Sequence, residues 1–452
     1  MNESLNELQR SLAGNVIRPA DPDYDAARRC FNALVDRRPA VIARCVGADD
    51  VATALDFARA HELEVAVRGG GHNPAGHCVC DEGLVIDLSR MRTVEVDGDA
   101  RIARSGGGAT WLDFDAATQA FGLVTPGGVI GSTGVCGLTL GGGIGHLTTQ
   151  HGLTCDNLVG GELVTPPGAA IRVGPDENAD LLWALRGGGG NFGVATRLEF
   201  RLHPLDRVVG GVLNYGGKGV REALRRFRDV AAGSPRDLSC QAVLSVDQSL
   251  APALVVAPCY TGSSSDPEEL RRLRSAPGLV DDGVRAHSFI EQQNVYQSAY
   301  GENRHYWKGH FVRELPDELL DELLRRITAL GRPPGGVLIE SLHGAPKDAD
   351  ETSAVVGFRG AAFNVSVMAT WQDAALDEQH IAWARETAAA IEPWSFSGGG
   401  YVNYMQADEP IERVRAAFGA EAFERLQALK STYDPSNVLR RNQNIPPLRG
   451  SR

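Results

Sequence analysis

The chain has 452 residues, and this length favours two domains of roughly 200 residues each, because one hydrophobic core rarely serves a longer chain. Its formal net charge of −12 at pH 7 argues against binding to a polyanion, so we expect no nucleic-acid partner. No apolar run approaches the roughly 20 residues that a membrane span needs, so we expect no membrane partner.

The first residues and the cysteines predict a cytoplasmic protein. Acidic and polar side chains occupy residues 1–8, where a secretory signal peptide would carry basic and then apolar ones. None of the eight cysteines belongs to a CxxC pattern, which is typical of reduced thiols and not of a disulfide framework.

The first 200 residues mix helices and strands. Apolar positions at helical spacing, with aspartates able to cap, predict a helix over 49–61 that leads into a strand beginning at Val65. Residues 84–88 are a candidate buried strand. Residues 93–104 are expected to fold back around Asp97-Gly98, a dipeptide that favours two-residue hairpin turns.

The chain from about residue 205 to residue 398 has a different pattern. Asp266 as a cap, with proline and two glutamates after it, predicts the start of a helix. Leucine and isoleucine at helical spacing over 319–330, before Gly331, predict a second amphipathic helix. Strand-like runs lie at 253–257, 337–339 and 365–371. We therefore expect an antiparallel sheet backed by helices, the second domain of an α+β protein.

The most informative segment is 65–76, which reads VAVRGGGHNPAG. Three consecutive glycines let backbone amides approach an anion without a Cβ in the way, and Arg68 adds a fixed cation. His72 stands where the loop ends. The pattern predicts a cofactor site in which a pyrophosphate is held with an imidazole beside the group that it carries.

Two other cofactor classes are disfavoured. Residues 188–193 have glycine at the three positions of the GxGxxG dinucleotide-binding motif, but that motif needs a strand before it and a helix after it. Here 181–185 is predicted to be a helix and 194–200 a strand, the reverse order. His72, His77, Cys78 and Cys80 have spacings that suit no common structural zinc site, so we expect no metal.

Five motifs together resemble a known family. They are RGGGHNPAG at 68–76, GLTLGGGIG at 137–145, LRGGGGNFG at 185–193, YVNY at 401–404, and YDPSN at 433–437 with NQNI at 442–445. The chain resembles the berberine bridge enzyme-like FAD-linked oxidases of the vanillyl-alcohol oxidase superfamily, which have a PCMH-type FAD-binding domain. The resemblance covers about residues 19–446. It implies an FAD-binding domain over 1–205, a substrate-binding domain over 206–398 and a C-terminal segment, 399–452, that returns to the FAD-binding domain.

The resemblance also implies roles for single residues. The family's histidine at the position of His72 bonds covalently to the 8α-methyl group of the flavin, whereas the alternative from the residues alone is a loop histidine that only forms hydrogen bonds. The position of the family's second, cysteinyl link falls at Ile130, six residues before Cys136, so we expect no second link and a packed thiol at Cys136. Further cofactor contacts are expected at Arg68, Gly69, Gly70, Gly71, Asn73, Gly76, His77, Gly128, Ser132, Thr133, Gly137, Gly142, Asn157, Asn403 and Asn442.

Hydride transfer to a flavin also needs a proton acceptor, and the family often uses a tyrosine. Tyr404 matches that position, Tyr401 is the reserve, and strand alternation would place Tyr404 and Asn403 on opposite faces. The alternative for Tyr404 is a core tyrosine with a satisfied hydroxyl. A phenolate near neutral pH needs a stabilising neighbour, and the candidates are Arg304, Tyr306 and Lys308. Candidate pocket walls are Trp307, Glu340, His343 and Trp371.

The expected function is an FAD-dependent oxidase that removes hydride from an alcohol, an amine or an activated carbon of a small organic molecule or secondary metabolite. The two electrons of the hydride would pass to O2 and give H2O2. The alternatives are a dehydrogenase of the same fold with another acceptor, and a flavoprotein that binds a ligand without turning it over.

Overall fold

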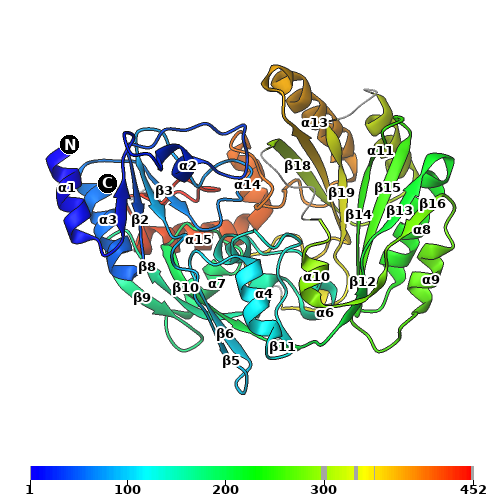
Figure 1. The fold of residues 1–452 in the computed structure, drawn as a ribbon, viewed down its shortest axis with the longest axis horizontal. Coiled ribbons are helices and arrows are strands. Elements are labelled where there is room, and N and C mark those ends of the chain that lie inside the picture. The colour runs from blue at the N-terminus through cyan, green and yellow to red at the C-terminus, as the bar shows by residue number, and fades with distance from the viewer. Residues whose placement is uncertain (1, 297–302, 330–333, 351, 449–452) are drawn as a thin grey trace.

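A computed structural model describes residues 2–296, 303–329, 334–350 and 352–448. Figure 1 shows two halves side by side, one built from the N-terminal strands with the C-terminal helices, the other from one large sheet with its own helices. The predicted helix end at Leu330 and Gly331 lies outside the described residues. Every described helix is too short or too polar to serve as a membrane span.

The described helices are α1 (Asn2–Ser11), α2 (Tyr24–Arg28), α3 (Ala48–Ala60), α4 (Trp111–Gln119), α5 (Val135–Leu140), α6 (Thr148–His151), α7 (Ala179–Leu185), α8 (Val220–Gly233), α9 (Glu268–Arg274), α10 (Phe289–Gln293), α11 (Asp317–Ala329), α12 (Ala345–Asp348), α13 (Asp377–Ile391), α14 (Ile411–Phe418) and α15 (Ala420–Tyr433). The predictions at 49–61, 181–185 and 319–330 correspond to α3, α7 and α11.

The first half holds two larger sheets. The four-stranded sheet runs in the order β1 (Asn15–Ile17), β2 (Val41–Arg44), β4 (Leu84–Asp87) and β3 (Val65–Arg68), and β2, β4 and β3 are parallel. The antiparallel five-stranded sheet runs in the order β5 (Val94–Asp97), β6 (Ile102–Gly106), β10 (Val194–Arg201), β8 (Leu158–Val164) and β9 (Ala170–Val173). Two short strands, β7 (Leu123–Val124) and β11 (His203–Pro204), pair separately. The strands predicted at Val65, 84–88 and 194–200 are confirmed as β3, β4 and β10.

The second half is a nine-stranded antiparallel sheet. Its main path is β16 (Leu279–Asp282), β13 (Leu213–Gly216), β15 (Pro252–Tyr260), β14 (Leu238–Val246), β19 (Gly335–Ser341), β20 (Phe363–Trp371) and β18 (Arg304–Val312), while β12 (Val208–Gly210) pairs with β15 and with β17 (Arg285–His287). This confirms the predicted α+β class and the antiparallel sheet with helices behind it. We propose domain limits near residues 205 and 398 on the basis of these sheets.

The two faces of the large sheet have different roles. Val337 and Ile339 of β19 pack in one core with side chains of α8, α11 and α13. Because side chains alternate along a strand, Glu340 lies on the opposite face, together with Asn364 directly across from it on β20. Figure 1 shows this face, which is opposite α8, α11 and α13, turned toward the first half. The sheet therefore presents polar side chains to the boundary between the halves.

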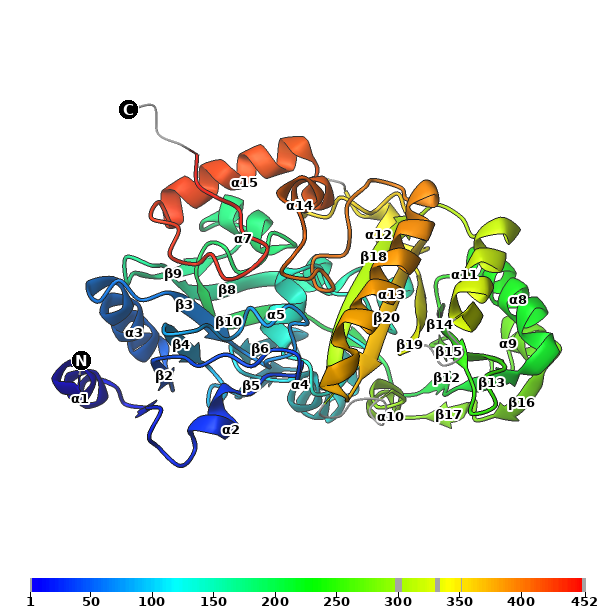
Figure 2. The same ribbon diagram turned by 90° about the horizontal axis from the view of Figure 1, so that it is seen from above.

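The C-terminal segment returns to the first half, where α15 packs against α7 (Figure 2). A fully buried ion pair secures it: the Nζ of Lys430 lies 2.6 Å from the Oδ2 of Asp434. The same ammonium donates to the carbonyl oxygens of Asn191, at 2.8 Å, and Leu439, at 3.0 Å. The tail is thereby fixed to the glycine-rich run at 187–193.

Two local predictions are corrected by contacts of aspartate side chains. The hairpin between β5 and β6 has a four-residue loop, because the Asp97 carboxylate accepts the amide of Ala100 at 2.9 Å and Arg101 takes the positive φ of 54°. At α9 the residue before the helix is Pro267, and the Asp266 carboxylate pairs with Arg274 at 3.0 Å instead of capping the helix.

Candidate active site

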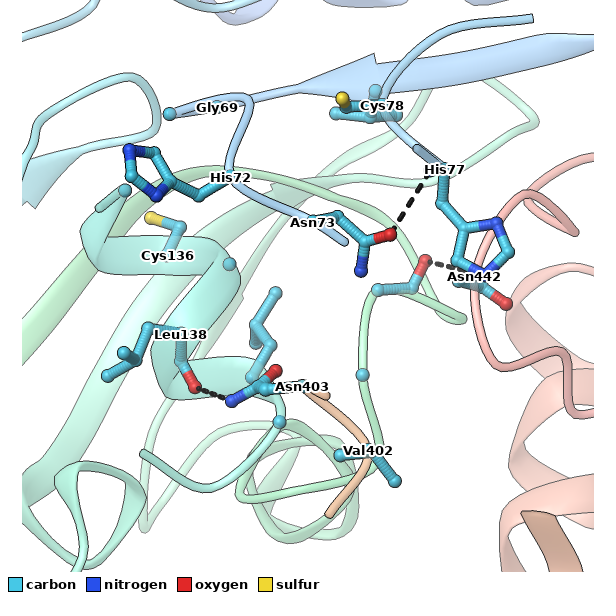
Figure 3. A pocket seen from close by; sticks show the side chains of 18 of the residues that line it. Gly69, His72, Asn73, His77, Cys78, Cys136, Leu138, Val402, Asn403 and Asn442 are labelled. Carbon is cyan, nitrogen blue, oxygen red and sulfur yellow. Dashed lines mark hydrogen bonds between the residues drawn. The ribbon is translucent and has the colours of Figure 1, made fainter. Parts of the chain in front are cut away.

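The first half contains a cavity that extends to the face of the large sheet, where Trp307 and Met368 contribute to its wall. Figure 3 shows His72 on one side of this cavity and Asn442 on the other, with Asn403 between them. The predicted site residues that line it are Gly69, Gly70, Gly71, His72, Asn73, His77, Gly128, Thr133, Gly137, Tyr401, Asn403, Tyr404 and Asn442. Four segments far apart in the sequence thus meet around one space.

Other predicted contacts lie outside the cavity wall. The guanidinium of Arg68 donates to the carbonyl oxygen of Ala27, so one of its donors is used within the protein. Asn157 is 2% exposed and donates to the carbonyl of Leu153 at 3.0 Å, while its oxygen contacts the Nε2 of His203 at 2.7 Å. Gly76 and Gly142 have φ values of +66° and +107°, which explains glycine there by backbone conformation.

The imidazole of His72 contacts two hydroxyl groups and one aromatic ring. Its Nε2 lies 3.0 Å from the Oγ of Ser132, and its Nδ1 lies 3.4 Å from the Oγ1 of Thr133. The ring of Phe31 stacks on it, with 4.7 Å between the ring centres and 15° between the planes. Burial lowers the pKa of His72 to about 4, so the imidazole is neutral at pH 7 and keeps a lone pair.

The cavity fits a dinucleotide with a flat ring system. A Cβ added to Gly137 or Gly190 would meet no atom within 4 Å, so bare backbone faces open space at both positions. Among the described residues, the Oδ1 of Asn442 and the Nε2 of His77 are buried without a hydrogen-bond partner. Bare backbone together with unsatisfied polar atoms indicates a site shaped for a ligand with both phosphate and amide-type groups.

The segment 401–404 is a turn, which corrects the predicted strand. The amide of Tyr404 donates to the carbonyl of Tyr401 at 2.8 Å, and all four residues of the turn line the cavity. The hydroxyl oxygen of Tyr401 accepts the amides of Gly143, at 3.0 Å, and Ile144, at 3.1 Å. Burial raises the pKa of Tyr401. This hydroxyl anchors the turn on the glycine run, so we assign Tyr401 a structural role.

Tyr404 faces a carboxylate instead of the predicted cations. Its hydroxyl donates to the Oε1 of Glu340 at 3.4 Å, and the other carboxylate oxygen accepts the Nδ2 of Asn364 at 2.7 Å. Glu340 is fully buried, and burial raises its pKa to about 7 although Asn364 and Tyr404 lower it. A carboxylate with this pKa is poised to accept a proton near neutral pH.

The proposed cations pair elsewhere. Lys308 lies 2.7 Å from the carboxylate of Glu409, and Arg304 binds Asp377. The hydroxyl of Tyr306 donates to Asp408 at 2.7 Å. Each cation has a nearby carboxylate of its own, which explains the correction.

The remaining pocket candidates separate into two groups. Trp307 lines the cavity and makes an edge contact with Tyr404, with 5.4 Å between the ring centres. His343 contacts the carbonyl of Pro235 at 3.3 Å, and Trp371 donates to Asp377 at 2.7 Å, both away from the cavity wall. The described residues contain no group of three or more histidine, cysteine, aspartate or glutamate side chains placed to hold a metal ion.

Ile130 and Cys136 both line the cavity, and Figure 3 shows Cys136 below His72. Cys136 is 5% exposed and packs in the hydrophobic core of the first half. Burial raises its pKa to about 12, so the thiol stays protonated at neutral pH.

Comparison with known proteins agrees with this geometry. Residues 39–174 match the family model of the FAD binding domain, and residues 400–446 match the model of berberine and berberine-like proteins. The chain is 31% identical over 449 residues to (R)-6-hydroxynicotine oxidase of Paenarthrobacter nicotinovorans, with 97% of each chain covered. The chain belongs to the berberine bridge enzyme-like FAD-linked oxidoreductases.

Solved structures support the same conclusion. The crystal structure of 6-hydroxy-D-nicotine oxidase from Arthrobacter nicotinovorans matches with a TM-score of 0.86 and 30% identity, covering 96% of this chain and 98% of the other. A variant of berberine bridge enzyme matches with a TM-score of 0.88 at 20% identity, covering 99% and 100% of the two chains, and shows the shared fold. This berberine bridge enzyme-like chain is therefore an FAD-linked oxidoreductase.

Sequence reasoning missed two features of this site. Glu340 appeared only as a candidate wall, although one acidic residue at the end of the apolar run 335–341 is a signal for a buried carboxylate. Phe31 and Asn32 have no recognisable motif, and only the fold brings them to His72 and to β18.

Proposed function

We propose that this chain is an oxidase that removes hydride from an alcohol, an amine or an activated carbon of a small organic molecule and delivers the electrons to O2, giving H2O2. The observation that carries the proposal is the hydrogen bond between Tyr404 and Glu340, because a hydroxyl bonded to a buried carboxylate at the edge of this cavity supports a role in proton transfer. Trp307 and Met368 supply apolar and aromatic walls there, which suit an organic substrate.

The residues of the chain would handle the proton. FAD, when bound, supplies a ring that accepts hydride and is reoxidised by O2. The Tyr404 oxygen takes a proton from the substrate O–H or N–H while the Tyr404 hydroxyl proton passes to Glu340. Asn364 holds the carboxylate through its second oxygen, at 2.7 Å, and so fixes the acceptor oxygen toward Tyr404. Burial keeps this exchange away from bulk water.

The proposed cofactor contacts follow the cavity wall. The amides of 69–71 and the glycines at 137 and 190 would approach the pyrophosphate, and Asn442 would supply its unpaired oxygen to FAD. His72 would carry the covalent bond to the flavin, because its neutral imidazole is a nucleophile at pH 7. Ile130 at the second link position has no nucleophilic atom, so we propose one covalent link only.

A substrate panel read by peroxide release tests the oxidase, with the Tyr404→Phe variant as the matched control. Substrate-dependent peroxide from the wild type, and much less from the variant, is the expected result. If substrates bleach the flavin but air restores its colour only slowly, the chain is a dehydrogenase that uses another acceptor. If ligands bind and never bleach the flavin, it is a binding protein without turnover.

The covalent link has its own test. Acid precipitation should leave the yellow colour in the pellet for the wild type and in the supernatant for His72→Ala. A wild-type peptide that contains unmodified His72, from protein that holds FAD, would contradict the link.

A further inference from the structure

A short segment joins the loop of His72 to the large sheet. We call residues 31–33 the strap. The amide of Phe31 donates to the carbonyl of Gly71 at 2.9 Å, which ties one end of the strap to the glycine loop. The amide of Ala33 donates to the carbonyl of Asn303 at 2.9 Å, which ties the other end to the start of β18. The strap thus bridges the two halves beside His72.

Asn32 makes the central connections of the strap and is 1% exposed. Its Nδ2 donates to the carbonyl of Pro74 at 2.6 Å and to the carbonyl of His305 at 2.8 Å. Its Oδ1 accepts the amide of His305 at 2.8 Å. One buried amide therefore binds the His72 loop and β18 together, and both of its polar atoms are satisfied.

Phe31 stacks on two histidine rings. The ring of His72 has its centre 4.7 Å from that of Phe31, and the ring of His305, which we call the outer ring, has its centre 4.2 Å away with 13° between the planes. The outer ring is fixed in turn, because the Nδ1 of His305 contacts the Oγ1 of Thr370 at 3.1 Å. Stacking contacts thus connect a ring on β18 to Phe31, and Phe31 to His72.

The loop of His72 needs this external support. Three glycines precede the histidine, and Gly71 has a φ of +70°, so the backbone alone defines the side chain weakly. The hydroxyls of Ser132 and Thr133 act in the plane of the imidazole and leave its tilt free. Stacking on Phe31 restrains that tilt.

We propose that Phe31 and Asn32 are positioning residues for the covalent attachment of FAD, holding the His72 imidazole at the angle at which it bonds to the flavin. This inference rests on the proposed function, which includes the link at His72. The strap controls the rate at which the covalent link forms. Because the strap is bonded to β18, the large sheet contributes to this control. The attachment would therefore depend on the two halves being packed together.

Covalent attachment of FAD to His72 is a two-electron oxidation of the flavin methyl carbon. A carbon–nitrogen bond forms between the imidazole and the 8α carbon of FAD, while a C–H bond of the methyl group and the imidazole N–H bond break. The two protons and two electrons released reduce the isoalloxazine ring. O2, the acceptor of the proposed oxidase, then takes both electrons and both protons and leaves as H2O2.

Attachment kinetics test the proposal without any substrate. Full-length protein prepared under riboflavin depletion is mixed with FAD, and acid-stable flavin and the mass of the His72 peptide are followed with time. Phe31→Leu should slow attachment about tenfold, because the imidazole loses its defined tilt. Phe31→Tyr keeps the ring and should restore the wild-type rate to within about twofold. Phe57→Leu is the matched control, since Phe57 of α3 stacks on His61 with 4.1 Å between the ring centres.

His305→Leu is the second variant, because it keeps Phe31 and removes only the outer ring; it should slow attachment in the same direction but less. Melting temperatures of all variants identify any that are unfolded. Equal rates for Phe31→Leu and wild type, or equal slowing by Phe31→Tyr and Phe31→Leu, would overturn the proposal. If wild-type protein binds FAD and leaves His72 unmodified, both the covalent link and this role of the strap are wrong. Peroxide release from the substrate panel tests the oxidase activity separately.

Discussion

Replacing Glu340 with glutamine should lower activity and raise stability above neutral pH. The side chain is fully buried, accepts the Asn364 amide at 2.7 Å and the Tyr404 hydroxyl at 3.4 Å, and has a pKa raised by burial to about 7. Glutamine has nearly the same shape and keeps an oxygen for Asn364, but it does not accept a proton. General-base catalysis contributes typically about 10² to 10⁴-fold in rate, so we expect a loss of at least about 100-fold in kcat/KM.

The stability change follows from proton linkage. The pKa of this carboxyl rises from 4.5, its ordinary value, to about 7 in the folded protein. Between these values the folded state binds more protons than the unfolded state, so the free energy of unfolding falls as pH rises. At about 1.36 kcal/mol per pH unit, the wild type loses about 3 kcal/mol between pH 4.5 and 7, and the variant does not.

Two measurements check the reasoning. The kcat/KM of the wild type should rise with pH through about 7 and then level off, because Glu340 must be ionised to accept the proton, and Glu340→Gln should lack this rise. Urea unfolding at pH 4.5 and at pH 8 should show the variant gaining stability relative to the wild type only at the higher pH.

Asp115 provides the control. It is a second buried carboxyl, away from the cavity wall, and burial raises its pKa to about 8. Asp115→Asn should also gain relative stability at high pH but should keep the wild-type kcat/KM profile. A Glu340→Gln enzyme that retains full activity with the same pH dependence, or that gains no stability at pH 8, would refute the assignment.

Three further predictions concern neighbouring and distant groups. Tyr404→Phe should lower kcat by about 100-fold and leave the FAD content unchanged, because only the hydroxyl that would exchange protons with Glu340 is lost. A turnover assay measures kcat, and the ratio of flavin to protein absorbance measures the FAD content. Asn364→Leu should move the rise in kcat/KM to higher pH, since the pKa of Glu340 loses a hydrogen bond that lowers it; an unmoved profile would contradict this. Lys430→Met should destabilise the protein by about 3 to 5 kcal/mol in urea unfolding, because it leaves Asp434 buried without its partner.

Much of the fold could be read from local pattern. Helical spacing gave the correct positions of α3 and α11, and apolar runs gave β3, β4 and β10. Predictions from short stretches of sequence were wrong where residues distant in the chain bind the side chain concerned. The predicted strand at 401–404 is a turn, in which the Tyr401 hydroxyl accepts the amides of Gly143 and Ile144.

The sequence by itself determined the glycine-rich loop after β3 and the α+β class, because glycine runs and hydrophobic periodicity act over a few neighbouring residues. Only the tertiary structure decided which groups work together. Tyr404 and Glu340 are 64 residues apart, and Asn32 and His305 are 273 apart. Their contacts depend on strand register within the large sheet and on the packing of the two halves, and no short stretch of sequence encodes either.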